Sequence, residues 1–579
     1  MSACLAVVPV HIATAHISYM PGDLAVEALE EIYAEAGYVF PVASFPIAKR
    51  DLVRYALRLE NLHPRMSGAV GEYLELLDYR PGEAMVTADL AIDYEGYWRS
   101  SGARWINEDL PYDSFEFQNR YLTMPEFLAL SLYAEKDDSS GMFIRAGIRN
   151  RYDPGDLLDS NFLEFHEDRI IRADHYFIRQ GYFYHFLGDL EVMLGRNKLH
   201  LGGGDYSTFM ASDRLPHVDA LTLRYRLGPI HMTSVSATLD NRRASGERDL
   251  RDDWNPENNN GNDDWWRDPF GMHEEGGIHP EPETEGVFPE DRLGWGSTII
   301  YYGVHRFDYL RERLRLGIAA QQFVARENNA FHLGDIFPVF SWHNTDVGPH
   351  NMSLIMDMAW RPVPRVELFL QAGYNDINAT ELIGIPDAAI PTIDAYLAGL
   401  SYRGDLGARR LRATAEVGYT HFLWGNFYDY NDEKGNYFAR GVYRFRTHGI
   451  YMMPMTAPYG PGVVWTRWQG DLSGFPLGEG DVSFGLDVEV LSRKDREYVN
   501  LVNTVYDPLD DDYSVYEDAP TELIWRVAPR VTYRHPRFGR WYVEPALHGW
   551  EDDTWMEVTL GAAITLQWRG RFDGAGGGI

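Results

Sequence analysis

The sequence predicts a mainly β protein, a transmembrane antiparallel β-barrel of about eighteen strands with a small N-terminal α-helical domain. Three observations predict this fold class: long stretches in which apolar and polar residues alternate, connections that alternate between short and long, and abundant aromatic residues. Aromatic residues make up 14% of the 579 residues and include 36 Tyr and 16 Trp. That share is expected where aromatic rings lie at membrane–water interfaces.

The N-terminal part, residues 16–82, is predicted to form a helical domain on the periplasmic side. Asp23 is suited to cap a first helix that ends at Gly37, Pro46 is suited to begin a second, and Ser67 precedes a third. The apolar positions of the three helices, spaced at three and four residues, are Leu24, Ala28, Leu29 and Ile32, then Leu52, Tyr55, Ala56 and Leu59, then Val70, Tyr73, Leu74 and Leu77.

The remainder, residues 83–572, has an apolar period of two and is predicted to form the barrel. The clearest stretches are residues 86–95, 313–321, 366–374, 411–419, 482–490 and 556–568. Because successive side chains of a strand face opposite sides, each stretch has one apolar and one polar face. These strands are about ten residues long, which suffices to cross a bilayer with a tilt, and no apolar run is long enough for a membrane-spanning helix.

The ends of the apolar rows favour a membrane barrel over its alternative, a soluble β-sandwich, which shows the same alternation. Several rows end in an aromatic residue, as an interfacial girdle does: Tyr94, Tyr374, Tyr419 and Trp568.

The connections between the predicted strands fall into two classes. Short turns carry arginine and are found at residues 226–230, 361–365 and 534–540. Long loops are acidic, and the loop at 241–292 holds fifteen Asp and Glu against six Lys and Arg. A second long loop covers 495–521. Short turns on one side and long, extracellular loops on the other are typical of Gram-negative outer-membrane barrels, so the predicted location is the bacterial outer membrane.

The interior of such a barrel is too wide for wall side chains to fill. The charged residues on the predicted inner face are therefore expected to face water: Arg412, Glu416, Asp487, Glu489, Arg526 and Arg530. The lumen is then either plugged or a pore. We expect the helical domain to close the periplasmic mouth.

Charge and motifs exclude several function classes. The net charge of −33 disfavours nucleic acid as a partner. The chain has no G-x-S-x-G elbow and nothing else that argues for catalysis, so the prediction is no enzyme, no cofactor and no metal. The Gly202-Gly203-Gly204 stretch lacks the lysine of a phosphate-binding loop and is read as a tight turn inside the barrel.

Residues 1–15 look like a truncated secretory signal, because an apolar stretch ends in the small residues Ala13 and Ala15. Cleavage after Ala15 would remove Cys4, the single cysteine, and leave no disulfide. The alternative is that Cys4 is a lipidation site.

The long loop at 241–292 contains the candidate carbohydrate-binding residues, which are Trp254, Trp265, Trp266 and Phe270. Aromatic rings can pack on the apolar faces of sugars while the surrounding Asn, Asp and Glu bind hydroxyl groups. The alternative reading is that these rings fold the loop over the barrel mouth.

Three segments resemble the capsule-assembly Wzi family. They are Ala28–Tyr38 with Ser44–Leu57, then Met193–Gly204 continuing to Ser212–Pro216, and Gly449–Met455 with Gly460–Gly462. In the second segment His200-Leu201 stands where the family usually has tryptophan before glycine. The resemblance extends in order over roughly residues 25–570, with insertions.

The resemblance implies an outer-membrane barrel of about eighteen strands with a helical bundle at its periplasmic end. It also implies a lectin-like, non-enzymatic role in attaching capsular polysaccharide to the cell surface. The expected partners are a surface or capsular polysaccharide and outer-membrane lipid. No sugar-contact residue of the family is carried over to this sequence. The alternative function is an outer-membrane porin or solute channel.

Overall fold

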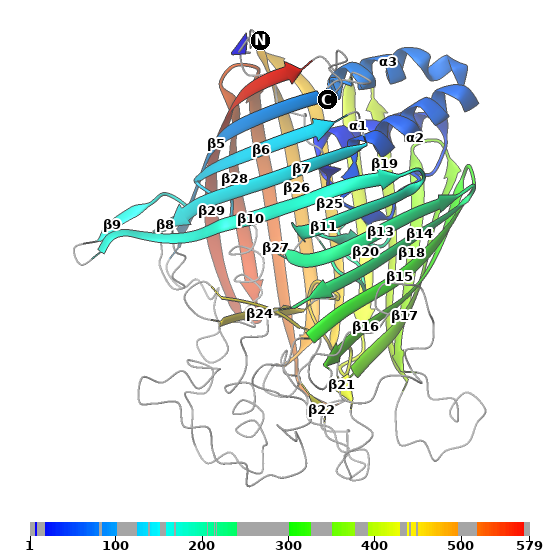
Figure 1. Ribbon diagram of the computed structural model, residues 1–579. Coiled ribbons are helices and arrows are strands. Elements are labelled where there is room, and N and C mark those ends of the chain that lie inside the picture. The colour runs from blue at the N-terminus through cyan, green and yellow to red at the C-terminus, as the bar shows by residue number, and fades with distance from the viewer. Residues whose placement is uncertain are drawn as a thin grey trace.

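The computed structural model (Figure 1) places the barrel wall, the helices and part of the connections. It describes residues 6–7, 18–79, 84–100, 124–136, 139–150, 158–166, 169–204, 206–212, 215, 217–239, 300–325, 350–376, 392–425, 427–428, 437–438, 442–446, 450–454, 456–495, 499 and 518–572.

Within these residues, eighteen antiparallel strands form one closed sheet. In order around the barrel they are β5 (Ala84–Arg99), β6 (Leu128–Lys136), β7 (Ser140–Asn150), β10 (Arg169–Leu187), β11 (Leu190–Asn197), β13 (Val218–Leu227), β14 (Ile230–Thr238), β15 (Ile300–Leu310), β16 (Leu314–Ala325), β17 (His350–Val363), β18 (Val366–Asp376), β19 (Ile393–Leu406), β20 (Arg409–Thr420), β25 (Val463–Leu477), β26 (Gly480–Lys494), β27 (Thr521–His535), β28 (Gly539–Trp550) and β29 (Asp553–Phe572). The last strand pairs with the first, from Phe572 opposite Ala84 to Glu557 opposite Arg99. This closure confirms the predicted barrel and excludes the sandwich.

Short strands add to this sheet or pair beside it. They are β1 (Ala6–Val7), which pairs with β29, β8 (Leu158–Ser160), β9 (Glu164–His166), β21 (Phe427–Tyr428), β22 (Tyr437–Phe438), the hairpin β23 (Val442–Arg446) and β24 (Ile450–Pro454), and the pairs β2 (Ser18–Tyr19) with β4 (Ile47–Ala48) and β3 (Ser44–Phe45) with β12 (His200–Leu201).

The outer face of the barrel is apolar, as the alternation predicted. On β16, Leu316 is 41% exposed whereas its neighbour Arg315 is 3% exposed, so the apolar side chain faces outward and the arginine faces the lumen. The ring of Tyr396 lies between those of Tyr374 and Tyr419, at centroid distances of 6.2 and 6.4 Å, and so joins β18, β19 and β20 in an aromatic row. This outer surface is what a strand must offer to lipid, and it places the chain in the outer membrane.

A charge introduced on the lipid-facing surface tests this orientation. We expect Leu370→Arg, near the middle of β18, to destabilise the folded barrel by about 2–4 kcal/mol. The same change at Leu406, at the turn end of β19, should cost only about 0–1 kcal/mol because the arginine there reaches water. Both side chains are exposed on the barrel surface. Equal costs for the two variants in a urea titration of lipid-inserted protein would contradict a lipid-facing belt.

The helices lie across one end of the barrel, where the short turns are (Figure 1). They are α1 (Leu24–Ala36), α2 (Lys49–Leu62), the 3₁₀ turn η1 (Pro64–Met66) and α3 (Ser67–Leu76). As predicted, α1 begins after Asp23 and ends at Gly37, whose φ of 80° is left-handed. The Asp23 side chain makes no cap bond to the helix and accepts instead from the Met20 N–H at 2.7 Å. In the described part of the chain, none of the helices is long and apolar enough to cross a membrane.

The predicted start of the second helix was wrong. Pro46 lies between β3 and β4, and α2 begins at Lys49. The backbone around Pro46 is extended because β3 pairs with β12 and β4 pairs with β2, which are partners from outside this segment. The predicted apolar face of α2 is nevertheless correct, since Leu52, Tyr55, Ala56 and Leu59 are all buried.

Candidate functional site

The described residues of the connection between β11 and β13, which are 198–204, 206–212, 215 and 217, lie inside the barrel, and we call them the lumen segment. It begins beside the helical domain, because β12 pairs with β3 and the Gly202 N–H donates to the Ala43 carbonyl at 2.8 Å. Five of its apolar side chains are at most 2% exposed: Leu199, Leu201, Phe209, Met210 and Leu215. Much of the lumen segment is therefore packed as a core element rather than solvated as a loop.

One side of the lumen segment is bonded to strands β15, β16 and β18. The Phe209 N–H donates to Oε1 of Gln371 at 2.6 Å, and Nε2 of Gln321 donates to the Phe209 carbonyl at 2.8 Å. The Ala211 N–H donates to the hydroxyl of Tyr302 at 3.1 Å. These wall side chains thus satisfy backbone groups of the segment that would otherwise be buried without a partner.

The other side of the lumen segment is bonded to strands β20, β25 and β26. The Tyr206 N–H donates to Oε1 of Glu416, and its hydroxyl donates to Oε1 of Glu489, both at 2.9 Å. The guanidinium carbon of Arg467 lies 3.1 Å from the centre of the Tyr206 ring, which is a cation–π contact. The segment leaves the wall at β11 and β13 and is bonded to strands as far round the barrel as β25 and β26, so it crosses the lumen.

Glycines let the lumen segment turn within this space, as the sequence predicted. Gly202 has a φ of 116°, which L side chains rarely adopt. A Cβ on Gly204 would lie 2.0 Å from the Ser207 carbonyl oxygen, and a Cβ on Gly203 would lie 2.8 Å from Nη2 of Arg315. A side chain on Gly204 would therefore collide with the segment's own backbone, and one on Gly203 would press on Arg315 of the wall.

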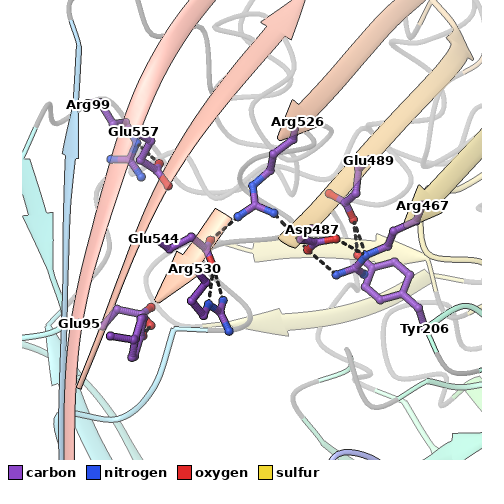
Figure 2. A network of polar contacts seen from close by, with 11 residues as sticks. Glu95, Arg99, Tyr206, Arg467, Asp487, Glu489, Arg526, Arg530, Glu544 and Glu557 are labelled. Atoms are coloured by element: carbon purple, nitrogen blue, oxygen red, sulfur yellow. Dashed lines mark hydrogen bonds and ion pairs between the residues drawn. The ribbon is translucent and has the colours of Figure 1, made fainter. Parts of the chain in front are cut away.

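Charged wall residues form a network across strands β25 to β28 (Figure 2). Nη2 of Arg467 and Nη1 of Arg526 both donate to Asp487, at 2.7 and 3.3 Å. Arg526 also pairs with Glu544, which in turn binds Arg530. Each carboxylate of this network therefore has an arginine on either side, and the network joins four neighbouring strands.

The prediction that the inward charges face water was wrong for the innermost of them. Glu416 and Glu489 are 2% and 3% exposed, because the lumen segment covers them and Tyr206 bonds to Oε1 of each. Near the short turns, the side chains of Arg412 and Arg530 keep 29% and 49% exposure. Of the two alternatives for the lumen, the described residues favour a plugged barrel.

The helical domain is bound to the short turns and their flanking strands by ion pairs. On α1, Glu27 and Glu31 both bind Arg412 of β20. On α2, the buried carboxylate of Asp51 binds Arg226 of β13, a member of one of the predicted arginine-bearing turns. Further pairs are Glu30 with Arg403, Glu31 with Arg410, Asp78 with Arg569 and Arg54 with Asp189. Ion pairs at and beside the short turns, most of them with the arginine on the barrel, therefore dock the helical domain.

Two of these contacts differ sharply in burial. Asp51 is only 1% exposed. Its partner Arg226 also donates through Nε to the Tyr55 hydroxyl at 3.2 Å. Burial raises the pKa of Tyr55, so this hydroxyl stays neutral. Asp189 lies in an exposed turn, where a hydrogen bond from Arg54 lowers the pKa of its carboxyl.

We expect Asp51→Ala to loosen the docking of α2, since it leaves the Arg226 guanidinium buried without its carboxylate. Breaking a buried pair costs about 3 kcal/mol or more, so amide hydrogen exchange in α2 should become faster by roughly a hundred-fold. Asp189→Ala removes the exposed pair and should leave α2 protection unchanged. Equal protection in both variants would contradict a role for the Asp51 pair in docking.

The candidate carbohydrate-binding residues, Trp254, Trp265, Trp266 and Phe270, lie outside the described residues, as does the whole loop at 241–292. Most of the loop at 495–521 lies outside them too. No group of three or more His, Cys, Asp or Glu that could hold a metal ion occurs within the described ranges.

Sequence reasoning missed the lumen segment itself as the element that fills the barrel. Its composition carried a signal, because the other long loops of the chain are acidic whereas this connection is rich in large apolar residues. They are Leu199, Leu201, Phe209, Met210 and Leu215. An apolar connection cannot remain in water at that density and must be buried somewhere.

Comparisons with known proteins agree on the barrel fold. No family model matches the chain, and no curated protein sequence does. The structure of Wzi of Escherichia coli, an outer-membrane protein involved in group 1 capsule assembly and described as a carbohydrate-binding β-barrel, aligns over 94% of this chain and 99% of its own, with a TM-score of 0.50 and 9% identity.

Two porin structures align less well. OpdK of Pseudomonas aeruginosa, solved with vanillate, covers 83% of this chain and 99% of its own at 10% identity, with a TM-score of 0.38. A BenF-like porin of Pseudomonas fluorescens aligns over 83% of this chain and 98% of its own, at 8% identity and with a TM-score of 0.39. The resemblance noted in the sequence is thus confirmed at the level of fold, and this chain is an eighteen-stranded outer-membrane β-barrel similar in fold to Wzi.

Proposed function

We propose that the protein is a non-enzymatic, lectin-like outer-membrane protein that binds a surface or capsular polysaccharide and helps to assemble it on the cell. The observation that carries the proposal is the filled lumen. Residues on the inner face such as Arg99, Arg306 and Glu557 are at most 1% exposed, whereas those of a diffusion pore face water.

The filled lumen disfavours the alternative function, a porin or solute channel. The fold likeness to Wzi, a protein described as carbohydrate-binding, supports the polysaccharide proposal. We propose further that the helical domain, residues 16–82, lies on the periplasmic side, since short turns mark that side in outer-membrane barrels. The long acidic loops at 241–292 and 495–521 are then extracellular and available to a surface glycan.

The proposed binding surface is the loop that carries Trp254, Trp265, Trp266 and Phe270. Many weak contacts with repeated sugars would add up through avidity. Because that loop is acidic, a polyanionic glycan requires bridging cations, and a neutral one does not.

A glycan array probed with the purified protein tests the proposal. We expect binding to at least one bacterial surface polysaccharide, and loss of that binding in the double variant Trp265→Ala with Trp266→Ala. Trp568→Ala, a substitution of the same kind on β29, serves as the matched control. An array on which the folded protein binds no polysaccharide would refute the function. Undiminished binding by the double variant would remove these two residues from the site.

A further inference from the structure

A cavity of about 220 Å³ lies where the helical domain, the lumen segment and the barrel wall meet. Its lining includes Glu27 and Glu30 of α1, Gly202 to Gly204 of the lumen segment and residues of strands β16 to β20 and β25. The volume is below the roughly 300–1,000 Å³ of sites for drug-sized ligands. It therefore suits a single small ring and not an oligosaccharide.

Charged side chains of the cavity wall balance one another. Four arginines and four carboxylates line it, and three ion pairs join them: Arg361 with Glu367, Arg403 with Glu30, and Arg412 with Glu27. The fourth arginine, Arg315, donates through Nη1 to the carbonyl oxygens of Phe40 and Val42 at 2.9 and 2.6 Å. The fourth carboxylate, Asp471 of β25, is half-buried. Because the lining carries no net charge, it offers a charged ligand no net electrostatic attraction.

The remaining lining offers the contacts that a hydroxyl-rich ring needs. Thr414 and Gln469 lie opposite each other on β20 and β25 and provide a hydroxyl and an amide. Phe40 and Phe45 supply apolar surface, and Phe45 packs edge-on against the His200 ring at a centroid distance of 6.2 Å. Gly203 and Gly204 line the cavity with backbone alone.

We propose that this cavity binds one uncharged sugar ring. Arginines donate to its hydroxyl oxygens, Asp471 accepts from its hydroxyl hydrogens, and the phenylalanines contact its apolar face. The inference rests on the proposed carbohydrate-binding function and adds to it a second site, on the short-turn side and built from wall, lumen segment and helices together.

Calorimetric titration of the detergent-solubilised full chain tests this site. The probes are glucose, galactose and mannose, with glucuronate and inorganic phosphate as charged counterparts. We expect saturable binding of at least one neutral hexose and weaker or no binding of the two anions. Asp471→Asn should weaken the binding at least about ten-fold, since it removes a charged acceptor. Thr414→Phe should abolish the binding by filling the cavity.

Asp481→Asn, the same change on neighbouring β26 and outside the cavity, is the matched control and should bind as the original chain does. Preference for either anion, no binding of any hexose, or unchanged binding by a folded Asp471→Asn variant overturns the proposal. The glycan array separates the two inferences. Polysaccharide capture without hexose binding removes only the cavity site, and hexose binding without polysaccharide capture removes only the surface function.

Discussion

Replacing the lumen segment by a short glycine-containing turn should open an ion channel through the barrel, and we expect the original chain to conduct far less. Asn197 and Val218 are opposite each other in the β11–β13 pair, so a hairpin of a few residues can join them directly. An empty barrel of this size leaves an aqueous passage, and we expect single-channel conductance in a planar bilayer to rise at least roughly ten-fold.

The wall charges explain why this variant can still fold. Glu416 and Glu489, which the lumen segment now covers, would be hydrated in the open lumen, as is usual for inward charges in porins. Heat-modifiable migration on a gel establishes that the barrel has closed. If the variant forms a closed barrel but its single-channel conductance does not rise, the lumen segment does not seal the barrel.

Deletion of residues 16–80 is the matched comparison. It removes the helical domain but leaves the bonds of the lumen segment to Gln371, Gln321 and Tyr302. We therefore expect a smaller rise in conductance than for removal of the lumen segment. The reverse order would identify the helices as the principal plug.

The second large effect concerns Arg306, whose side chain is fully buried between two aspartates. Its Nε donates to Asp308 and its Nη2 to Asp357, each at 2.9 Å. A Cβ on Gly317 would lie 2.3 Å from Nη2, so a glycine is required to admit the guanidinium. We expect Arg306→Met to destabilise the barrel by about 3–5 kcal/mol because two buried carboxylates lose their cation.

Urea unfolding in detergent measures this cost. Arg196→Met is the control, since the side chains of Arg196 and Asp219 are 34% and 49% exposed and their pair should be worth only about 0–1 kcal/mol. The triple variant Arg306→Met, Asp308→Leu and Asp357→Leu should recover part of the stability, because the three charges are removed together while the nearby Arg315, which is 3% exposed, keeps its charge. Similar losses for Arg306→Met and Arg196→Met would show that the buried network contributes little.

The wall of the barrel was predictable because its signal is local. Neighbours such as Arg315 and Leu316 alternate within one strand, and that alternation alone assigns one to the lumen and the other to lipid. The helical domain was predictable in part for the same reason, through Gly37 and the apolar spacing of α2, whereas only Leu29 of the four residues predicted on the apolar face of α1 is buried. The start of α2 was missed because β3 is extended only by virtue of its pairing with β12.

The contents of the lumen were decided by the tertiary structure. Phe209 and Gln371, whose bond helps to hold the lumen segment, are 162 residues apart, and Tyr206 and Glu489 are 283 apart. Sequence patterning therefore determined which residues face lipid, the approximate number of strands and where in the chain the helices lie. Whether the inward charges face water or are buried depended on the lumen segment, which fills the barrel. The sequence did not reveal this, because contacts between residues far apart in the chain leave no periodic pattern in either segment.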